Sequence, residues 1–123
     1  MRESKFRAWQ QVTKIMFYNI EKGTGAPGGN PPFADYLENT RMIVMQYTGF
    51  KDKSGKEIYE GDIVRMFGWN ELEQVMWCDN GFYVVTLNSE DASPQLIPHN
   101  HRGEADSLEV IGNGYEQPEL MKT

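Results

Sequence analysis

The chain has 123 residues, the length of a single domain, and a formal net charge of −6 at pH 7. Its single cysteine, Cys78, excludes an intramolecular disulfide framework and suits a reducing compartment. The sequence has no run of about 18 apolar residues and no apolar signal region after Met1, so we expect a soluble cytoplasmic protein without a membrane partner.

The N-terminal third predicts a hairpin followed by a loop. Residues 5–9 and 15–20 are rich in aromatic and β-branched side chains, which is typical of two paired strands. Residues 21–32 contain four Gly and three Pro, so this stretch can neither pair in a sheet nor hold a helix.

A short helix and a strand follow the loop. Residues 33–39 predict two helical turns that begin after a Pro pair, with Phe33, Tyr36 and Leu37 on one side. Residues 41–47 predict a strand with apolar side chains on both faces, which indicates that both faces are covered.

The middle of the chain predicts a series of strands joined by polar turns. Glycine tolerates the positive φ that a reversal needs, so Ser54-Gly55 and Gly61-Asp62 are expected to be turns. Residues 63–69 and 74–78 continue as strands. The sequence Asp79-Asn80-Gly81 then predicts a three-residue hairpin loop, with the glycine in the left-handed conformation, before a strand at 82–87.

The C-terminal third predicts less regular structure. Residues 88–103 are polar and irregular, residues 108–111 form a last strand that Gly112 interrupts, and residues 118–121 form one helical turn. Five or six short strands at hairpin spacing favour a small barrel over a sandwich.

The segment MQYTGFKDKSGKEIYEGDIV, residues 45–64, resembles the YopX family of proteins carried by bacteriophages and prophages. Residues 5–9 resemble the family's opening, and residues 109–120 resemble its close, whereas Gln10, Phe50 and Gly114 depart from the usual residues. The resemblance implies an all-β, SH3-like core without catalytic residues. We therefore expect one domain over residues 1–123, with an N-terminal β-hairpin, a Gly/Pro-rich loop and a short helix over 1–44, a small SH3-like barrel over 45–112 and a C-terminal turn over 113–123.

Two motifs suggest a ligand but are better explained as loops. Residues 23–28 satisfy G-x-G-x-x-G, yet a Gly-Asn-Pro-Pro stretch follows instead of the helix that binds a pyrophosphate. His99 and His101, with Glu104 and Asp106 nearby, have metal-ligand chemistry but lie between Pro98 and Gly103 in a predicted loop. We therefore predict no cofactor and no metal.

Catalysis is not predicted either, because Cys78 ends an apolar strand and has no evident basic neighbour. Most of the central aromatic residues are expected to fill the core; these are Tyr47, Tyr59, Phe67, Trp69, Trp77, Phe82 and Tyr83. Trp69 is the candidate partner-binding residue, because it immediately precedes a polar connection between strands.

Charge bears on the choice of partner. Residues 1–65 hold 10 Lys and Arg against 8 Asp and Glu, and residues 66–123 hold 2 against 10. The acidic part disfavours general attraction to nucleic acid, because such binding needs phosphates to be neutralised. We expect a non-catalytic phage or prophage accessory protein that binds an unidentified host or phage protein or assembles into a homo-oligomer. The alternative is a nucleic-acid-binding module with a basic N-terminal face.

Overall fold

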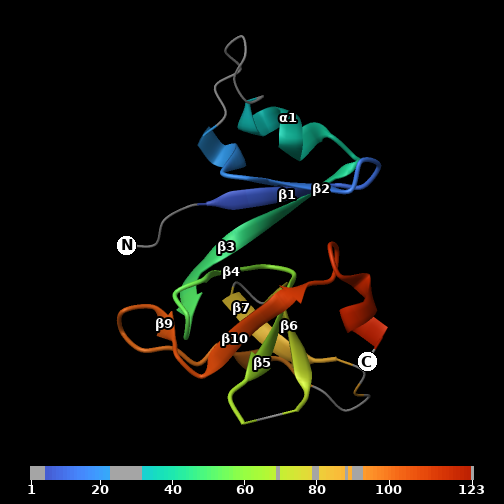
Figure 1. The fold of residues 1–123 in the computed structure, drawn as a ribbon. Coiled ribbons are helices and arrows are strands. Elements are labelled where there is room, and N and C mark those ends of the chain that lie inside the picture. The colour runs from blue at the N-terminus through green and yellow to red at the C-terminus, as the bar shows by residue number, and fades with distance from the viewer. Residues whose placement is uncertain are drawn as a thin grey trace. The chain divides into compact units, whose positions relative to one another are not determined.

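The computed structural model describes residues 5–22, 32–68, 70–78, 81–87, 89 and 93–122. Its elements in chain order are β1 (Phe6–Gln10), β2 (Ile15–Tyr18), the 3-10 helix η1 (Ile20–Lys22), α1 (Phe33–Glu38), β3 (Met42–Asp52), β4 (Glu57–Tyr59), β5 (Asp62–Met66), β6 (Leu72–Cys78), β7 (Gly81–Thr86), β8 (Gln95–Leu96), β9 (Glu104–Ala105), β10 (Leu108–Asn113) and the 3-10 helix η2 (Pro118–Lys122). The predominance of strands confirms the predicted all-β class (Figure 1).

The described strands form two five-stranded sheets and do not close into a barrel. One sheet has the order β2-β1-β3-β4, with β9 also paired to β3, and the other has the order β10-β5-β6-β7-β8. By contact density the chain divides into two compact units, Met1–Tyr47 and Thr48–Thr123. These are unit 1 and unit 2; their folding as one domain stays a prediction.

Unit 1 is built on the predicted hairpin. β1 and β2 pair antiparallel, and β1 also pairs antiparallel with the first half of β3. The core of this unit contains Ala8, Ile20 and Tyr36, with Phe6 and Phe17 packed against it. Ile20 was expected to end a strand, but it lies in η1, where it is fully buried.

The predicted helix is present as α1, but its buried side differs from the expectation. Tyr36 is buried, whereas Leu37 is 58% exposed. Neighbouring positions point about 100° apart around a helix, so α1 turns Tyr36 to the core and leaves Leu37 facing solvent. None of the described helices has the length and apolar character needed to cross a membrane.

Unit 2 has an apolar core that draws on both sheets. Its buried residues are Phe50, Ile58, Val64, Val75, Phe82, Val84, Ile97, Ala105 and Leu108. They come mainly from alternate positions of the strands, as expected for strands with one face turned to a core.

Several predicted strand boundaries in unit 2 were wrong, among them the starts of β6 and β7 and the ends of β3, β5 and β10. β5 ends at Met66, because Phe67 and Gly68 form a turn and Gly68 takes a positive φ of 84°. Gly81 pairs with Cys78 as the first residue of β7, so it belongs to the strand and not to the loop. β10 continues through Gly112 to Asn113, and an irregularity in its pairing with β5 falls between Val110 and Gly112.

Candidate functional site

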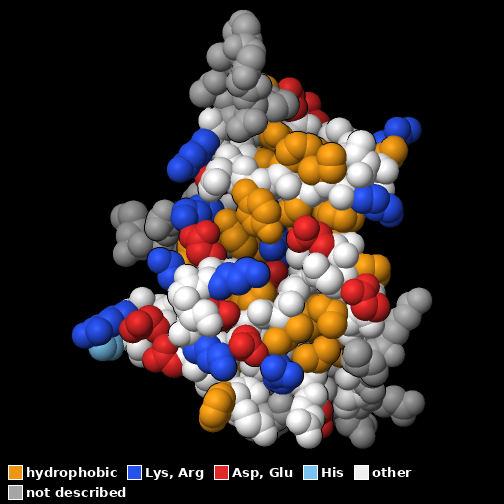
Figure 2. All heavy atoms as spheres, in the orientation of Figure 1, with side chains coloured by type: hydrophobic (Ala, Val, Ile, Leu, Met, Phe, Trp, Pro, Cys, Tyr) orange, Lys and Arg blue, Asp and Glu red, His pale blue; other side chains and the backbone are white. Residues whose placement is uncertain are grey.

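A cleft of about 330 Å³ lies on unit 2. Its lining residues are Lys53, Arg65, Phe67, Gly68, Asn70, Ser107 and Glu109. They come from the turn after β3, from the end of β5 and its following turn, and from the start of β10. Basic and acidic side chains lie next to one another over β5 and β10 in the space-filling view (Figure 2).

Backbone hydrogen bonds hold the three segments of the cleft together. The amide of Lys53 donates to the carbonyl oxygen of Leu108 at 3.0 Å, and the amide of Phe67 donates to that of Ser107 at 2.7 Å. Arg65 and Glu109 are directly opposite in the antiparallel ladder of β5 and β10, so their side chains share one face. The positions of the side chains therefore follow from strand register.

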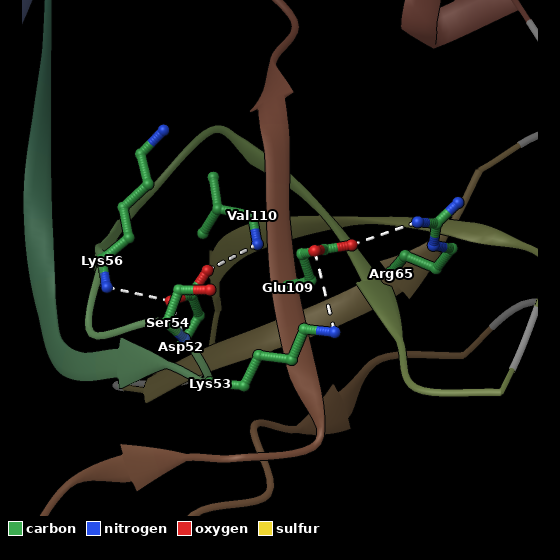
Figure 3. Close-up of polar contacts among 7 residues, drawn as sticks. All are labelled: Asp52, Lys53, Ser54, Lys56, Arg65, Glu109 and Val110. Carbon is green, nitrogen blue, oxygen red and sulfur yellow. Dashed lines mark hydrogen bonds and ion pairs between the residues drawn. The ribbon is translucent and has the colours of Figure 1, made fainter.

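Asp52 fixes the turn that carries Lys53. Its Oδ1 accepts hydrogen bonds from the amides of Ser54 and Lys56, both at 2.9 Å, and its Oδ2 accepts one from the amide of Val110 at 2.9 Å (Figure 3). The carboxylate is buried and ties the turn to β10. Asp52 is thus a positioning residue beneath the cleft and does not line it.

Glu109 lies between the two cations of the cleft. Its Oε1 accepts a hydrogen bond from Arg65 Nη2 at 3.1 Å, and its Oε2 is 3.7 Å from Lys53 Nζ (Figure 3). All three side chains are more than one third exposed, so water screens these ion pairs and each contributes less than about 1 kcal/mol to stability. Two cations share one carboxylate, which leaves the cleft with an excess positive charge.

An exposed aromatic ring forms the apolar part of the cleft. Phe67 is 75% exposed, and Lys53 Nζ lies 5.4 Å from the centroid of its ring. Beside the ring, a Cβ added at Gly68 would meet no described atom within 4 Å other than those of its chain neighbours. The cleft therefore presents an aromatic face and two basic groups to solvent.

The structure describes some of the residues that were singled out from the sequence, and others lie outside the described part of the chain. Trp69 lies outside the described residues, so its role in partner binding stays a prediction. Tyr47, Tyr59 and Phe82 are buried, as expected of core aromatics, whereas Tyr83 is half-buried and Phe67 and Trp77 are exposed. Residues 23–28, the glycine-rich motif, also lie outside the described part of the chain.

The two histidines, His99 and His101, lie in different environments. The imidazole of His99 stacks on Phe50 with ring centroids 4.1 Å apart, and its Nδ1 is 2.8 Å from the carbonyl oxygen of Ile97, with which it shares a hydrogen bond. His101 is exposed in a turn. Within the described ranges, no three His, Cys, Asp or Glu side chains are grouped so that they would hold a metal ion.

Sequence reasoning missed the cleft itself. The turn at Ser54-Gly55 was predicted without a role for Lys53, and Arg65 and Glu109 were not connected, because they are 44 positions apart. One usable signal was the glycine after Phe67, which ends the strand and exposes the ring before it.

The sheets and the cleft define a small β-rich protein with a mixed aromatic and charged surface site. A model of the YopX protein family matches residues 29–122, so the chain belongs to the YopX family, as its central segment predicted. A solved structure, protein EF1440 from Enterococcus faecalis, is 26% identical and has a TM-score of 0.64, with 98% of this chain and 99% of that chain covered. No curated protein matches the sequence.

Proposed function

We propose that this protein is a non-catalytic accessory protein of a phage or prophage that works in the cytoplasm of the bacterial host as a protein-binding or self-assembling module. Membership of the YopX family and the character of the cleft support this function. The partner is an unidentified host or phage protein or further copies of the chain.

The observation that carries the proposal is the exposure of Phe67 next to two cations. The ring is 75% exposed although its backbone is fixed by a hydrogen bond to Ser107, so the exposure belongs to an ordered turn. Aromatic and Arg side chains are enriched where proteins bind one another, because they bury a large area and pair with several acceptors. The cleft combines both kinds of side chain.

The chemistry of the lining residues supports a role without catalysis. Ser107 supplies a hydroxyl to the cleft, and the described residues that line it include no His or Cys. A serine nucleophile needs a base within hydrogen-bond reach and a third group to orient that base. Binding through charge and apolar contact needs neither.

We also propose that residues 45–112 have an SH3-like arrangement. The support is the strand order of unit 2, in which β5, β6, β7 and β8 follow one another across the sheet and β10 returns to pair with β5. A meander whose last strand returns to its first has the connectivity that a small barrel requires.

Capture experiments with a variant of Phe67 test the proposed function. The wild-type protein and a Phe67→Ala variant are used to capture proteins from an induced host lysate. The molar masses of the purified wild type and variant in solution are measured separately by light scattering. We expect Phe67→Ala to lose a captured protein or an oligomer while its melting temperature stays within about 2 °C, because the ring is outside the core.

The matched control is Val12→Ala, which removes another exposed apolar side chain, 62% exposed, from unit 1. Equal capture and equal mass for the wild type and Phe67→Ala would contradict the proposal. Steeply salt-dependent retention of DNA or RNA by the wild type would instead favour the nucleic-acid-binding alternative.

A further inference from the structure

We propose that the cleft binds a carboxylate that a partner protein presents beside an apolar side chain, and that this carboxylate replaces Glu109 on Arg65 and Lys53. The inference rests on the proposed function and adds the chemistry that the cleft recognises. Glu109 acts here as an internal occupant that the partner's acidic residue displaces.

Glu109 already shows how a carboxylate sits in the cleft. Its two oxygens face different cations, with Oε1 3.1 Å from Arg65 Nη2 and Oε2 3.7 Å from Lys53 Nζ. Both contacts are open to solvent, so exchanging Glu109 for another carboxylate does not require a buried ion pair to be broken. The site is preformed, because strand register and backbone bonds set all three positions.

Arg65 retains binding capacity after its contact with Glu109. A guanidinium has five N–H donors in a planar fork, and within the described part of the chain one of them donates to Glu109. Carboxylates match this fork with two parallel hydrogen bonds, which makes the pairing stronger than a single contact. A partner carboxylate therefore gains more from Arg65 than Glu109 does.

The exposed ring of Phe67 indicates that the ligand has an apolar part. The ring is largely exposed, so an aliphatic or aromatic side chain of a partner can cover it without moving the backbone. Covering apolar surface is favourable roughly in proportion to its area. A ligand with an acidic residue next to an apolar one would contact both the basic groups and the aromatic ring of the cleft.

The charge of unit 2 favours a carboxylate over nucleic acid. This unit holds 6 Lys and Arg against 14 Asp and Glu, so a polyanion meets repulsion over most of its surface. The cleft itself has two cations and one carboxylate, which matches one additional single negative charge. A protein segment with one acidic residue is the ligand that fits both observations.

Titration with short peptides tests the inference. The probes are acetyl-Ala-Leu-Glu-Ala-amide, the same peptide with Gln in place of Glu, inorganic phosphate and an eight-nucleotide oligothymidylate. Binding is followed by amide chemical shifts of Lys53, Gly68 and Glu109 in a ¹⁵N-labelled full chain. We expect the Leu-Glu peptide to bind roughly two- to five-fold more tightly than the Leu-Gln peptide, and neither phosphate probe to bind as tightly.

Variants of the cleft give the decisive comparison. Glu109→Gln frees both cations and should tighten the Leu-Glu peptide roughly two- to five-fold, whereas Arg65→Gln should weaken it by a similar factor. Arg102→Gln, which removes an exposed cation outside the cleft, is the matched control and should leave binding unchanged. A merely structural role of Glu109 cannot produce tighter binding.

Unchanged or weaker peptide binding by Glu109→Gln would overturn the inference, and so would preferential binding of phosphate or the oligonucleotide. If the peptides do not bind while Phe67→Ala still loses its captured partner, the inference fails and the proposed function stands. If Phe67→Ala changes neither capture nor mass but the peptides bind as expected, the proposed function fails, and what stands is the preference of the cleft for a carboxylate beside an apolar side chain.

Discussion

The carboxylate of Asp52 accepts a hydrogen bond from the backbone amide of Val110, 58 positions later in the chain, at 2.9 Å. The same carboxylate accepts hydrogen bonds from the backbone amides of Ser54 and Lys56 within its own turn. One buried side chain thus performs the local task of closing a turn and the long-range task of fastening that turn to β10. These hydrogen bonds fix the turn so that Lys53 lines the cleft.

Replacing Asp52 with Ala should destabilise the protein by about 2–3 kcal/mol, because three amides lose the acceptor that they share. Urea denaturation measures this loss. Asp106→Ala, at an exposed aspartate of the same unit, should change the stability by less than about 0.5 kcal/mol. Equal effects of the two substitutions would show that the network does not stabilise the fold.

The hydroxyl of Thr48 gives a second prediction. Thr48 is fully buried, its Oγ1 donates to the carbonyl oxygen of Ile58 at 2.8 Å, and it accepts from the amide of Phe50 at 3.1 Å. Thr48→Val keeps the shape but removes the hydroxyl, so we expect a loss of about 1–3 kcal/mol. Thr48→Ser keeps both hydrogen bonds and should cost less. A smaller loss for Thr48→Val than for Thr48→Ser in denaturant titrations would contradict this account.

Glu73 predicts a dependence of stability on pH. Burial raises the pKa of this carboxyl, and the nearby charge of Glu71 raises it further. Its Oε1 is buried and has no hydrogen-bond partner among the described residues. The folded state therefore binds the proton of Glu73 more tightly than the unfolded state does. The free energy of unfolding should fall as the pH rises above the ordinary Glu pKa of 4.5, and then level off above the raised pKa.

Glu73→Gln removes this titration and should be more stable than the wild type at pH 7, with a difference that shrinks toward pH 4. Thermal melts across that range measure the difference. Glu71→Gln removes the smaller cause and should produce a smaller gain of the same sign. A gain that stays constant with pH would show that ionisation of Glu73 is not responsible.

Gly112 gives a prediction about the C-terminal segment. A Cβ placed there would lie 2.5 Å from Gln117 Oε1, the atom that accepts a hydrogen bond from the backbone amide of Asn113. Gly112→Ala should therefore cost about 1–3 kcal/mol through overpacking and displacement of this hydrogen bond. Gly114→Ala should cost less, because the nearest atoms belong to the flexible side chain of Met121. Equal losses would contradict the role assigned to Gln117.

Local sequence features predicted much of the fold. The hairpin of β1 and β2, the short helix α1 and the turn at Ser54 followed from periodicity and turn residues, and the structure contains them. Gly112 shows where this reasoning stops. A glycine in a strand was taken as the end of the strand, but the structure uses it so that Gln117 can approach the backbone.

The candidate site could not be predicted from local sequence for a related reason. Arg65 and Glu109 meet only because β5 and β10 pair in one particular register, which the sequence of either strand alone does not specify. Phe67 was assigned to the core because apolar residues usually fill small β folds. Its exposure depends on the turn at Phe67 and Gly68, because β5 ends at Met66 and not at residue 69 as predicted.

β3 has a consequence for how such chains can be recombined. Its first half pairs with β1 in unit 1 and its last two residues pair with β9 in unit 2, all within one unbroken run of 11 residues. A chimera joined between Tyr47 and Thr48 would have to preserve the phase of the alternating side chains on both sides of the junction. The two units are therefore poor candidates for exchange as independent modules, although each has its own core.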